Sequence, residues 1–236
     1  MNKTKSGVYP VRDYRTMRKN QGVSNGVYPV RDYRTMRKNQ GVSNGVYKAI
    51  ILRRTIRRFK QKPIPKSILK RLINAARLAP SAANLQPLEF IIITDKGICT
   101  KIFHHLRWAG YIAPYGTPPE GKHPVAYIAV LVNKIKAQPK YAAYDVAAAV
   151  QNILLAAWEQ GIGSCWMQAI ERSKIKRILG IPRDFCLDSI IALGYRAEVM
   201  PVVEEFSGSV KYWKDKKGTL HVPKRSLDEI LRWNTF

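Results

Sequence analysis

The feature that most limits how this chain can fold is one long apolar stretch, Tyr141–Gln160, which reads YAAYDVAAAVQNILLAAWEQ. Its composition and length predict a helix, which Gly161 closes as a C-terminal cap. Apolar residues lie on nearly every side of such a helix, so it has to be covered on every side. The many alanines allow a second helix to approach closely. We therefore expect a buried helix of the kind that lies at the centre of a dimer.

The same stretch has about the length that a membrane-spanning helix needs. Four polar or charged residues interrupt it, namely Asp145, Gln151, Asn152 and Glu159. These interruptions favour burial inside protein over a membrane span. A chain of 236 residues can form one sizeable core or two small ones. One chain does not easily cover this helix by itself, which favours a homodimer.

A cluster of arginines, RRTIRRF, occupies Arg53–Phe59 directly after the apolar run Ala49–Leu52. A guanidinium group is permanently charged and offers a planar fork of donors that suits a phosphate, and the Thr55 hydroxyl adds a neutral donor. If the preceding helix continues through the cluster, Arg53 and Arg57 share one face. Taken alone, the cluster is more typical of a solvated basic surface than of a phosphate site.

A polar turn follows about twenty residues later, where Pro80, Ser81, Asn84 and Gln86 crowd together before the apolar run Phe90–Ile93. Proline, serine and asparagine are typical of a chain that turns from a helix into a strand. Serine, asparagine and glutamine carry neutral hydrogen-bonding groups that can bind the edge of a heterocycle.

These motifs give the chain a resemblance to the FMN-dependent nitroreductase family. The matching stretches, in chain order, are RRTIRRF at Arg53, PSAANLQP at Pro80, GIGSCWMQ at Gly161 and HVPKR at His221. The resemblance runs from about residue 45 to residue 236. It implies an α+β fold with a mixed central sheet flanked by helices and FMN at a homodimer interface. Leu88 stands where family members usually carry tryptophan, which concerns packing near the site.

The resemblance also implies which residues hold the cofactor. The arginine cluster and the HVPKR motif would bind the FMN phosphate. Of the polar turn, Pro80, Ser81 and Asn84 would approach the flavin from the other subunit, and Gln86 would contact it from its own. Gln168 and Ala169 stand near the ring where many relatives have Glu-Gly. The implied set is Arg53, Arg54, Thr55, Arg57, Pro80, Ser81, Asn84, Gln86, Gln168, Ala169, Lys224 and Arg225.

The resemblance implies an oxidoreductase that takes electrons from NADH or NADPH and passes them to a nitroaromatic, a quinone or a similar small-molecule acceptor. The residues themselves contain no HExxH, P-loop, paired-carboxylate or nucleophile-elbow motif. Gly161-Ile162-Gly163 lacks the third glycine of a dinucleotide fingerprint and follows a helix rather than a strand. We therefore expect no catalytic side chain, because a bound flavin would carry the chemistry in alternating steps of reduction and reoxidation.

The net charge of +25 raises an alternative, a basic protein that binds nucleic acid or an anionic surface without redox chemistry. The excess is spread along the chain, and no aromatic-interleaved basic motif of a nucleic-acid module is present. We therefore favour the flavoprotein. Three widely spaced cysteines, Cys99, Cys165 and Cys186, show no metal-ligand spacing and are typical of reduced thiols in a cytoplasmic protein.

The chain divides into an N-terminal repeat and a nitroreductase-like domain. Residues 7–25 recur letter for letter at 26–44, and each copy is basic and poor in apolar residues. We expect residues 1–44 to be a disordered appendage and residues 45–236 to form the FMN domain. Within the domain, we expect helices from residue 46 into the arginine cluster and at 66–78, 99–108, 141–160, 173–179 and 227–233. The expected strands are 88–94, 125–133, 164–168 and 189–193, with a loop at 113–124.

Overall fold

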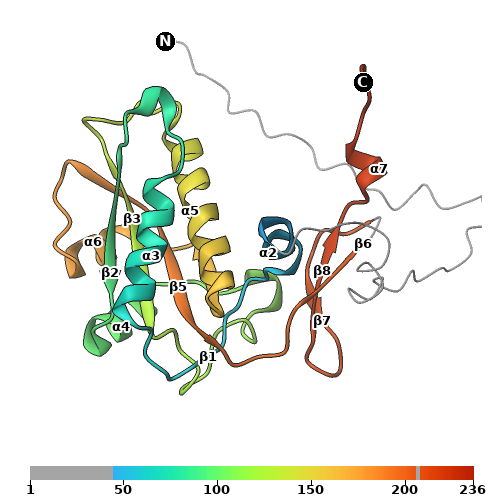
Figure 1. Ribbon diagram of the computed structural model, residues 1–236. Coiled ribbons are helices and arrows are strands. Elements are labelled where there is room, and N and C mark those ends of the chain that lie inside the picture. The colour runs from blue at the N-terminus through green and yellow to red at the C-terminus, as the bar shows by residue number, and fades with distance from the viewer. Residues whose placement is uncertain (1–44, 206–207) are drawn as a thin grey trace, which may run out of the picture.

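The structure is a computed structural model and describes residues 45–205 and 208–236; the repeat at 1–44 lies outside the described residues. Its centre is a five-stranded sheet (Figure 1). The order of neighbouring strands in this sheet is β1 (Phe59–Lys60), β5 (Phe185–Arg196), β3 (Ala126–Asn133) and β2 (Leu88–Ile93). Strand β4 (Ile162–Met167) also pairs with β5.

Strand β5 is the strand to which most of this sheet attaches, because β1, β3 and β4 all pair with it in antiparallel fashion. Both β3 and β4 pair with Ile190–Leu193 of β5, so they flank it on opposite sides and run in the same direction without touching. The expected α+β fold with helices around a central sheet is confirmed. The structure refines the expected mixture of strand directions, because parallel pairing in the described part of this sheet is limited to the bridge between Thr55 and Ser164.

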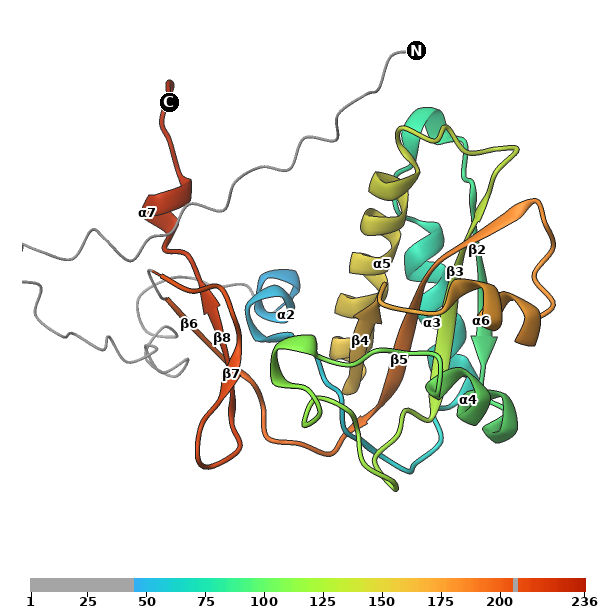
Figure 2. The same cartoon turned by 180° about the vertical axis from the view of Figure 1, so that it is seen from behind.

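Helices cover both faces of the central sheet, so the domain has three layers (Figures 1 and 2). Helices α3 (Lys66–Arg77) and α5 (Ala142–Glu159) pack on one face, and α4 (Lys96–Phe103) and α6 (Arg172–Ile178) pack on the other. Along β3, Ile128 and Val130 pack in the core beneath α3 and α5, whereas Tyr127 and Ala129 pack in the core beneath α4 and α6. The strand is buried on both faces, as its nearly continuous apolar sequence predicts.

The remaining elements lie outside these layers or connect them. They are α2 (Val46–Leu52), the short 3-10 helices η2 (Ala82–Asn84) and η3 (Gly110–Ile112), β6 (Val202–Glu205), β7 (Trp213–Lys214), β8 (Leu220–Lys224) and α7 (Leu227–Ile230). Three expected helices have different bounds. Helix α2 ends at Leu52, before the arginine cluster. Helix α4 begins before Cys99 because the Asp95 side chain caps it, accepting from the Ile98 amide at 2.8 Å. Helix α7 is shorter than expected, since Arg232 donates to the Asp228 carbonyl at its end.

Helix α5 has the predicted bounds to within one residue, but the single chain covers only part of its surface. Val146, Val150 and Ile153 are buried, whereas Tyr144 is 71% exposed and Gln151 is exposed. The expectation of burial on every side is therefore not met within one chain. No helix in residues 45–205 or 208–236 is long and apolar enough to cross a membrane.

Two glycines that face each other in the β4–β5 ladder, Gly163 and Gly194, leave a bare patch on the sheet. Ile56 and Phe59 occupy this glycine patch, and both are completely buried. A Cβ atom added at Gly163 would lie 2.9 Å from the Ile56 side chain, and one added at Gly194 would lie 2.8 Å from Phe59. The two glycines are therefore required for close packing, and they seat the arginine segment, residues 53–59, on the sheet.

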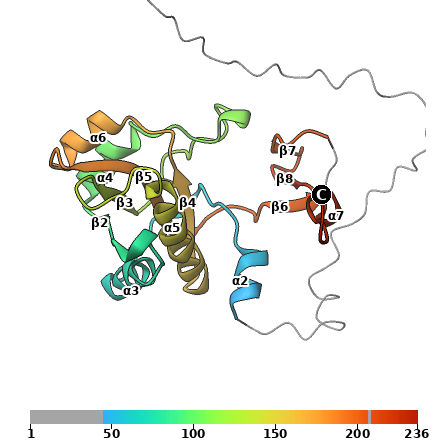
Figure 3. The same cartoon turned by 90° about the horizontal axis from the view of Figure 1, so that it is seen from above.

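A second, three-stranded sheet of β6, β8 and β7 lies on the far side of α2 from the central sheet (Figures 1 and 3). His221 of β8 stands between two carboxylates. Its Nδ1 atom is 3.2 Å from Glu204 of β6, and its Nε2 atom is 3.2 Å from Asp215, which follows β7. The imidazole also stacks on Trp213 with ring centroids 4.1 Å apart. His221 thereby ties all three strands together.

The protonated form of His221 suits this position. Burial by itself lowers the pKa of His221, but the hydrogen bonds with Asp215 and Glu204 outweigh burial and raise the pKa. An imidazolium can donate to both carboxylates, whereas a neutral imidazole can donate to only one of them. The charge on the ring therefore stabilises the C-terminal sheet.

We expect Gly194→Ala to lower the free energy of unfolding by about 1–3 kcal/mol, the usual cost of forcing an extra methyl group into a packed core. Gly110→Ala is the matched control, because its added Cβ would meet no non-neighbouring heavy atom within 4 Å. Urea denaturation of both variants and of the wild type measures the difference. An unchanged midpoint for Gly194→Ala would contradict the close packing of Phe59.

We expect the C-terminal sheet to loosen as the pH rises. Because folding raises the pKa of His221, the charged ring contributes its full stabilisation at pH values below the unfolded pKa of about 6.5. This stabilisation is lost as the pH rises through the higher pKa of the folded state. Amide exchange in β8, corrected for intrinsic rates, should therefore accelerate as the pH rises above about 6.5. His221→Gln should abolish this dependence, and the exposed His104→Gln should keep it. Equal pH dependence in His221→Gln would refute the role of the imidazolium.

Candidate functional site

The arginine segment is extended rather than helical. Helix α2 ends at Leu52, and Thr55 bridges to Ser164 of β4, whose carbonyl accepts from the Ile56 amide at 2.9 Å. The prediction that Arg53 and Arg57 share a helix face is therefore wrong. The edge of β4 offers backbone partners and the glycine patch accepts Ile56, and both favour an extended chain here.

Arg53 and Arg57 nevertheless come together, because alternate residues of an extended chain lie on one side. Both act on the thiol of Cys165 in β4. Burial raises the pKa of this thiol to about 11, and the positive charges of Arg57 and Arg53 oppose that rise. Burial lowers the pKa of Arg53 itself. Both guanidinium groups are therefore close enough to Cys165 to affect the pKa of the same thiol.

Neither Arg53 nor Arg57 has a carboxylate to pair with. In the part of the chain that the structure describes, no ion pair involves either guanidinium group. Both residues are half-buried, and Arg57 lies 5.7 Å from the centroid of the Tyr212 ring. Partly desolvated positive charges without a counter-ion are costly, and an anion that accepted their hydrogen bonds would remove that cost. The pair is therefore a candidate anion site.

Arg54 belongs to the predicted phosphate-binding group but turns toward backbone carbonyls. Its Nη1 atom donates to the carbonyls of Ile51 and Arg53 at 2.8 Å each, and its Nε atom donates to Pro201 at 3.3 Å. Burial lowers the pKa of Arg54, and the neighbouring charge of Arg53 lowers it further. Arg54 thus joins the end of α2 to the segment that precedes β6.

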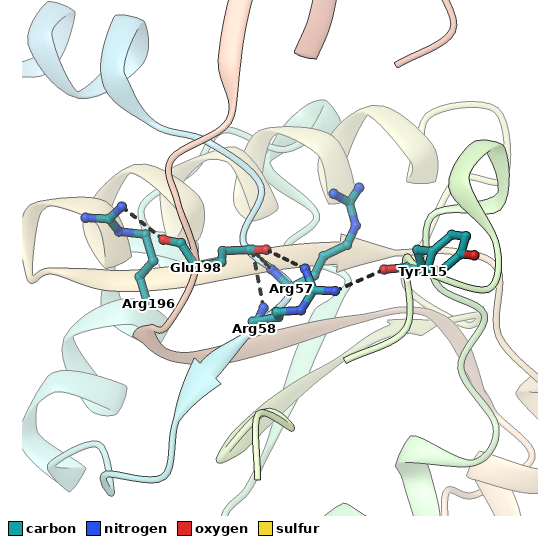
Figure 4. Close-up of polar contacts among 5 residues, drawn as sticks. All are labelled: Arg57, Arg58, Tyr115, Arg196 and Glu198. Carbon is teal, nitrogen blue, oxygen red and sulfur yellow. Dashed lines mark hydrogen bonds and ion pairs between the residues drawn. The ribbon is translucent and has the colours of Figure 1, made fainter. Parts of the chain in front are cut away.

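Arg58 is held by the carboxylate of Glu198, a residue outside the four motifs that lies in the connection after β5 (Figure 4). Arg58 Nη1 lies 3.5 Å from Glu198 Oε2, and Arg58 Nη2 donates to the Tyr115 carbonyl at 3.1 Å. No local pattern marks Glu198, because the residues that it contacts are distant in the sequence.

The polar turn is a tight loop held by its own polar groups. The Ser81 hydroxyl accepts from the Gln86 amide at 3.1 Å, and the Gln86 side chain donates to the Asn84 carbonyl at 3.4 Å. Ala83, Asn84 and Gln86 all have positive φ angles near 50°. Non-glycine residues adopt this conformation at a cost, and such strain gathers at functional sites.

Asp145, in the first turn of α5, anchors this loop. It is 94% buried by accessible area, with 6% exposed, and its Oδ1 atom accepts from the Ala82 amide at 2.9 Å. One signal in the sequence points to this role, since a lone carboxylate within an apolar helix requires a partner when it is buried. The loop and helix together line a cleft of about 540 Å³ that includes Pro80, Ser81 and Tyr144.

Gln168 and Ala169 lie directly after β4. The Gln168 side-chain amide is 3.5 Å from Asp188 Oδ2, and the Ala169 carbonyl accepts from the Arg107 amide at 3.0 Å. Since Thr55 bridges to Ser164 on the same strand, these residues belong to the side of the domain that carries the arginine segment.

Lys224 ends β8, and Arg225 follows it. Arg225 donates to the Glu229 carbonyl at 2.7 Å and pairs with the Glu229 carboxylate at 3.5 Å. Within the described residues, neither basic group forms a hydrogen bond or ion pair with the arginine segment. The structure thus does not bring the two predicted phosphate-binding motifs together in a single chain.

Two other residues of the C-terminal sheet do lie beside the arginine segment. Tyr212 faces Arg57, and it also lies 4.9 Å from Tyr111 between ring centroids. Burial lowers the pKa of Lys214, and the nearby charge of Arg58 lowers it further. Sequence reasoning missed both residues, because only the pairing of β7 with β8 brings them to this position.

The predicted site residues therefore fall into separate groups. The arginine segment and Gln168 lie beside β4, which follows the C-terminal end of α5. The polar turn lies at the N-terminal end of α5 (Figure 1). The 18 residues of α5 extend about 27 Å at 1.5 Å per residue. A ligand that contacts both groups would need the polar turn of another subunit.

No group of three or more histidine, cysteine or acidic side chains is placed to hold a metal ion within residues 45–205 and 208–236. All three cysteines are free thiols; Cys99 and Cys165 are buried and Cys186 is exposed.

Comparison with known proteins identifies the family of this chain. The sequence pattern of the nitroreductase family matches residues 50–115 and 122–195. These ranges cover more than half of the chain, so the protein belongs to the nitroreductase family. The resemblance drawn from the four motifs is thereby confirmed.

Relatives agree in sequence and in fold. A protein of Archaeoglobus fulgidus, named as a candidate NADH dehydrogenase/NAD(P)H nitroreductase, is 33% identical over 159 residues, which cover 63% of this chain and 83% of the relative. A protein of the same description from Methanothermobacter thermautotrophicus is 31% identical, over 64% of this chain and 77% of the relative. A candidate nitroreductase of Desulfovibrio desulfuricans, solved in complex with FMN, superposes with a TM-score of 0.63 at 26% identity, covering 83% of this chain and 99% of that one.

Proposed function

We propose that the protein is an FMN-dependent oxidoreductase that takes electrons from NADH or NADPH and reduces nitroaromatics, quinones or similar acceptors. The observation that carries this proposal is that Arg53 and Arg57 are both half-buried, lie close enough to affect the Cys165 thiol, and pair with no carboxylate among the described residues. An FMN phosphate would supply the missing counter-charge. The FMN complex of the Desulfovibrio relative supports the choice of anion.

We propose that residues beside β4 would hold the FMN molecule. Arg53, Thr55 and Arg57 would hold the phosphate, and Gln168 and Ala169 would face the ring at the other end of the strand. We propose a cofactor-binding role for the remaining residues of the implied set as well, with Gln86 reaching the flavin from the partner subunit together with the rest of the polar turn. When bound, the flavin supplies the electron transfer, so the side chains bind and orient it and exclude water.

We propose that the active form is a homodimer. The exposed stripe of α5 includes Tyr144 (71% exposed), Ala147 and Gln151, which recur at helical spacing. A second subunit packed on this stripe would cover it. It would also bring its own Pro80, Ser81 and Asn84 toward the flavin bound by its partner.

We further propose that donor and acceptor use one pocket in turn, which gives ping-pong kinetics with parallel double-reciprocal lines. The connection that contains Tyr115 lies next to the arginine segment through Arg58. It is therefore placed to shape the pocket and to affect which acceptors fit. The competing proposal, a basic protein without redox chemistry, predicts a purified protein without the yellow colour of a flavin.

We expect FMN to bind much more tightly than riboflavin, which lacks the phosphate. Replacing both Arg53 and Arg57 with glutamate should weaken FMN binding by at least about 100-fold, since each lost charge-assisted hydrogen bond is worth about 1.5–3 kcal/mol. Riboflavin binding should change little. Flavin fluorescence titrations measure both affinities, with Arg183→Glu as a distant exposed control. A double variant that retains FMN as tightly as the wild type would refute the phosphate site.

We expect Ala147→Glu to weaken the dimer without unfolding the chain, because Ala147 is exposed on α5. Ala149→Glu is the contrasting variant, since Ala149 is 1% exposed and a charge there would destabilise the core. Sedimentation velocity and thermal denaturation separate the two effects. A monomeric Ala147→Glu protein that still holds FMN at wild-type affinity would show that the site does not need two subunits.

A further inference from the structure

We propose that Glu198 is a positioning residue that fixes the backbone of the arginine segment so that Arg57 can hold the phosphate. This inference rests on the proposed function and extends it to a residue outside the four motifs. Glu198 lies 141 positions from Arg57 in the chain, in the connection between β5 and β6.

The carboxylate of Glu198 binds the backbone of the segment more closely than it binds any side chain. Its Oε1 atom accepts from the Arg57 amide at 2.5 Å and from the Arg58 amide at 3.3 Å. The nearest guanidinium atom, Nη1 of Arg58, is 3.5 Å from Oε2. The Glu198 side chain is only 16% exposed, so these bonds are largely shielded from water.

The connection that carries Glu198 is itself fixed to the segment by the backbone. The Ala197 amide donates to the Arg58 carbonyl at 2.9 Å, and Arg196 donates to the Glu198 carbonyl at 3.2 Å. Phe59 pairs with Arg196 in the β1–β5 ladder. The carboxylate is therefore held in place from both sides rather than extended from a mobile loop.

This arrangement directs the two neighbouring arginines to different places (Figure 4). The guanidinium group of Arg58 turns toward Glu198 and the Tyr115 carbonyl, whereas that of Arg57 extends away from the carboxylate. Glu198 thus satisfies the Arg57 amide without pairing with the Arg57 guanidinium group, which lies by Cys165 and Tyr212 instead. Without Glu198, two half-buried amides would lose their acceptor, and the segment would lose the contact that fixes its path.

Charge alone predicts the opposite effect of Glu198 on phosphate binding. A carboxylate beside the site repels a phosphate, so a purely electrostatic role predicts tighter FMN binding once Glu198 is removed. The positioning role predicts weaker binding after Glu198→Ala. It also predicts that Glu198→Gln retains binding, because a glutamine oxygen can still accept from the Arg57 amide and carries no repelling charge.

The experiment compares FMN and riboflavin affinities of the wild type, Glu198→Ala and Glu198→Gln, with the exposed Glu89→Ala as the control for loss of one negative charge. We expect Glu198→Ala to weaken FMN binding about tenfold or more and to leave riboflavin binding unchanged, the effect of losing one hydrogen bond to a charged group. Glu198→Gln should bind FMN at least as tightly as the wild type. Tighter FMN binding in both Glu198 variants, or equal losses for both flavins, would overturn the proposal.

Amide exchange in the flavin-free protein provides a second readout. Residues 53–59 should exchange faster in Glu198→Ala than in the wild type, and Glu198→Gln should restore most of the protection. Unchanged protection in Glu198→Ala would overturn the positioning role. A wild type that does not prefer FMN over riboflavin would instead reject the proposed function, while exchange would still show whether Glu198 fixes the segment.

Discussion

The packing of Ile56 and Phe59 on the glycine patch is the contact on which the candidate site depends. Gly163 and Gly194 pair in the β4–β5 ladder, and a Cβ atom on either would collide with the side chain above it. Because both apolar side chains are seated on the sheet, the polar residues between and around them are fixed along the edge of β4. The close packing of Ile56 and Phe59 thus fixes the backbone positions from which the charged side chains of the arginine segment extend.

The electrostatics of the site follow from this placement. Among residues 45–205 and 208–236, no carboxylate forms an ion pair with Arg53 or Arg57, and Glu198 beside the segment binds mainly backbone amides. Positive charges therefore outnumber negative ones at this point, in a place where burial already disfavours them, as the lowered pKa of Arg53 shows. A dianion such as the FMN phosphate relieves this imbalance, which connects the geometry of the segment to the proposed cofactor.

Helix α5 explains why the site is divided in a single chain. It carries the core of one layer on its buried side, anchors the polar turn through Asp145 at one end, and leads into β4 at the other. Its exposed stripe lies between these two groups. The proposed homodimer would cover the stripe and complete the site with the same contact, so assembly and cofactor binding would be coupled.

The sequence by itself determined the elements whose signals are local. The apolar pattern of α5 set its bounds to within a residue, the apolar run at residues 125–133 identified a strand, and four short motifs identified the family. Tertiary structure decided what depends on distant residues. It made the arginine segment extended, because β4 and the glycine patch outweigh helix propensity, and it placed Glu198 beside Arg57 across 141 positions of chain. Such contacts leave no periodicity or spacing to detect, since they arise only when β5 returns the chain to the sheet.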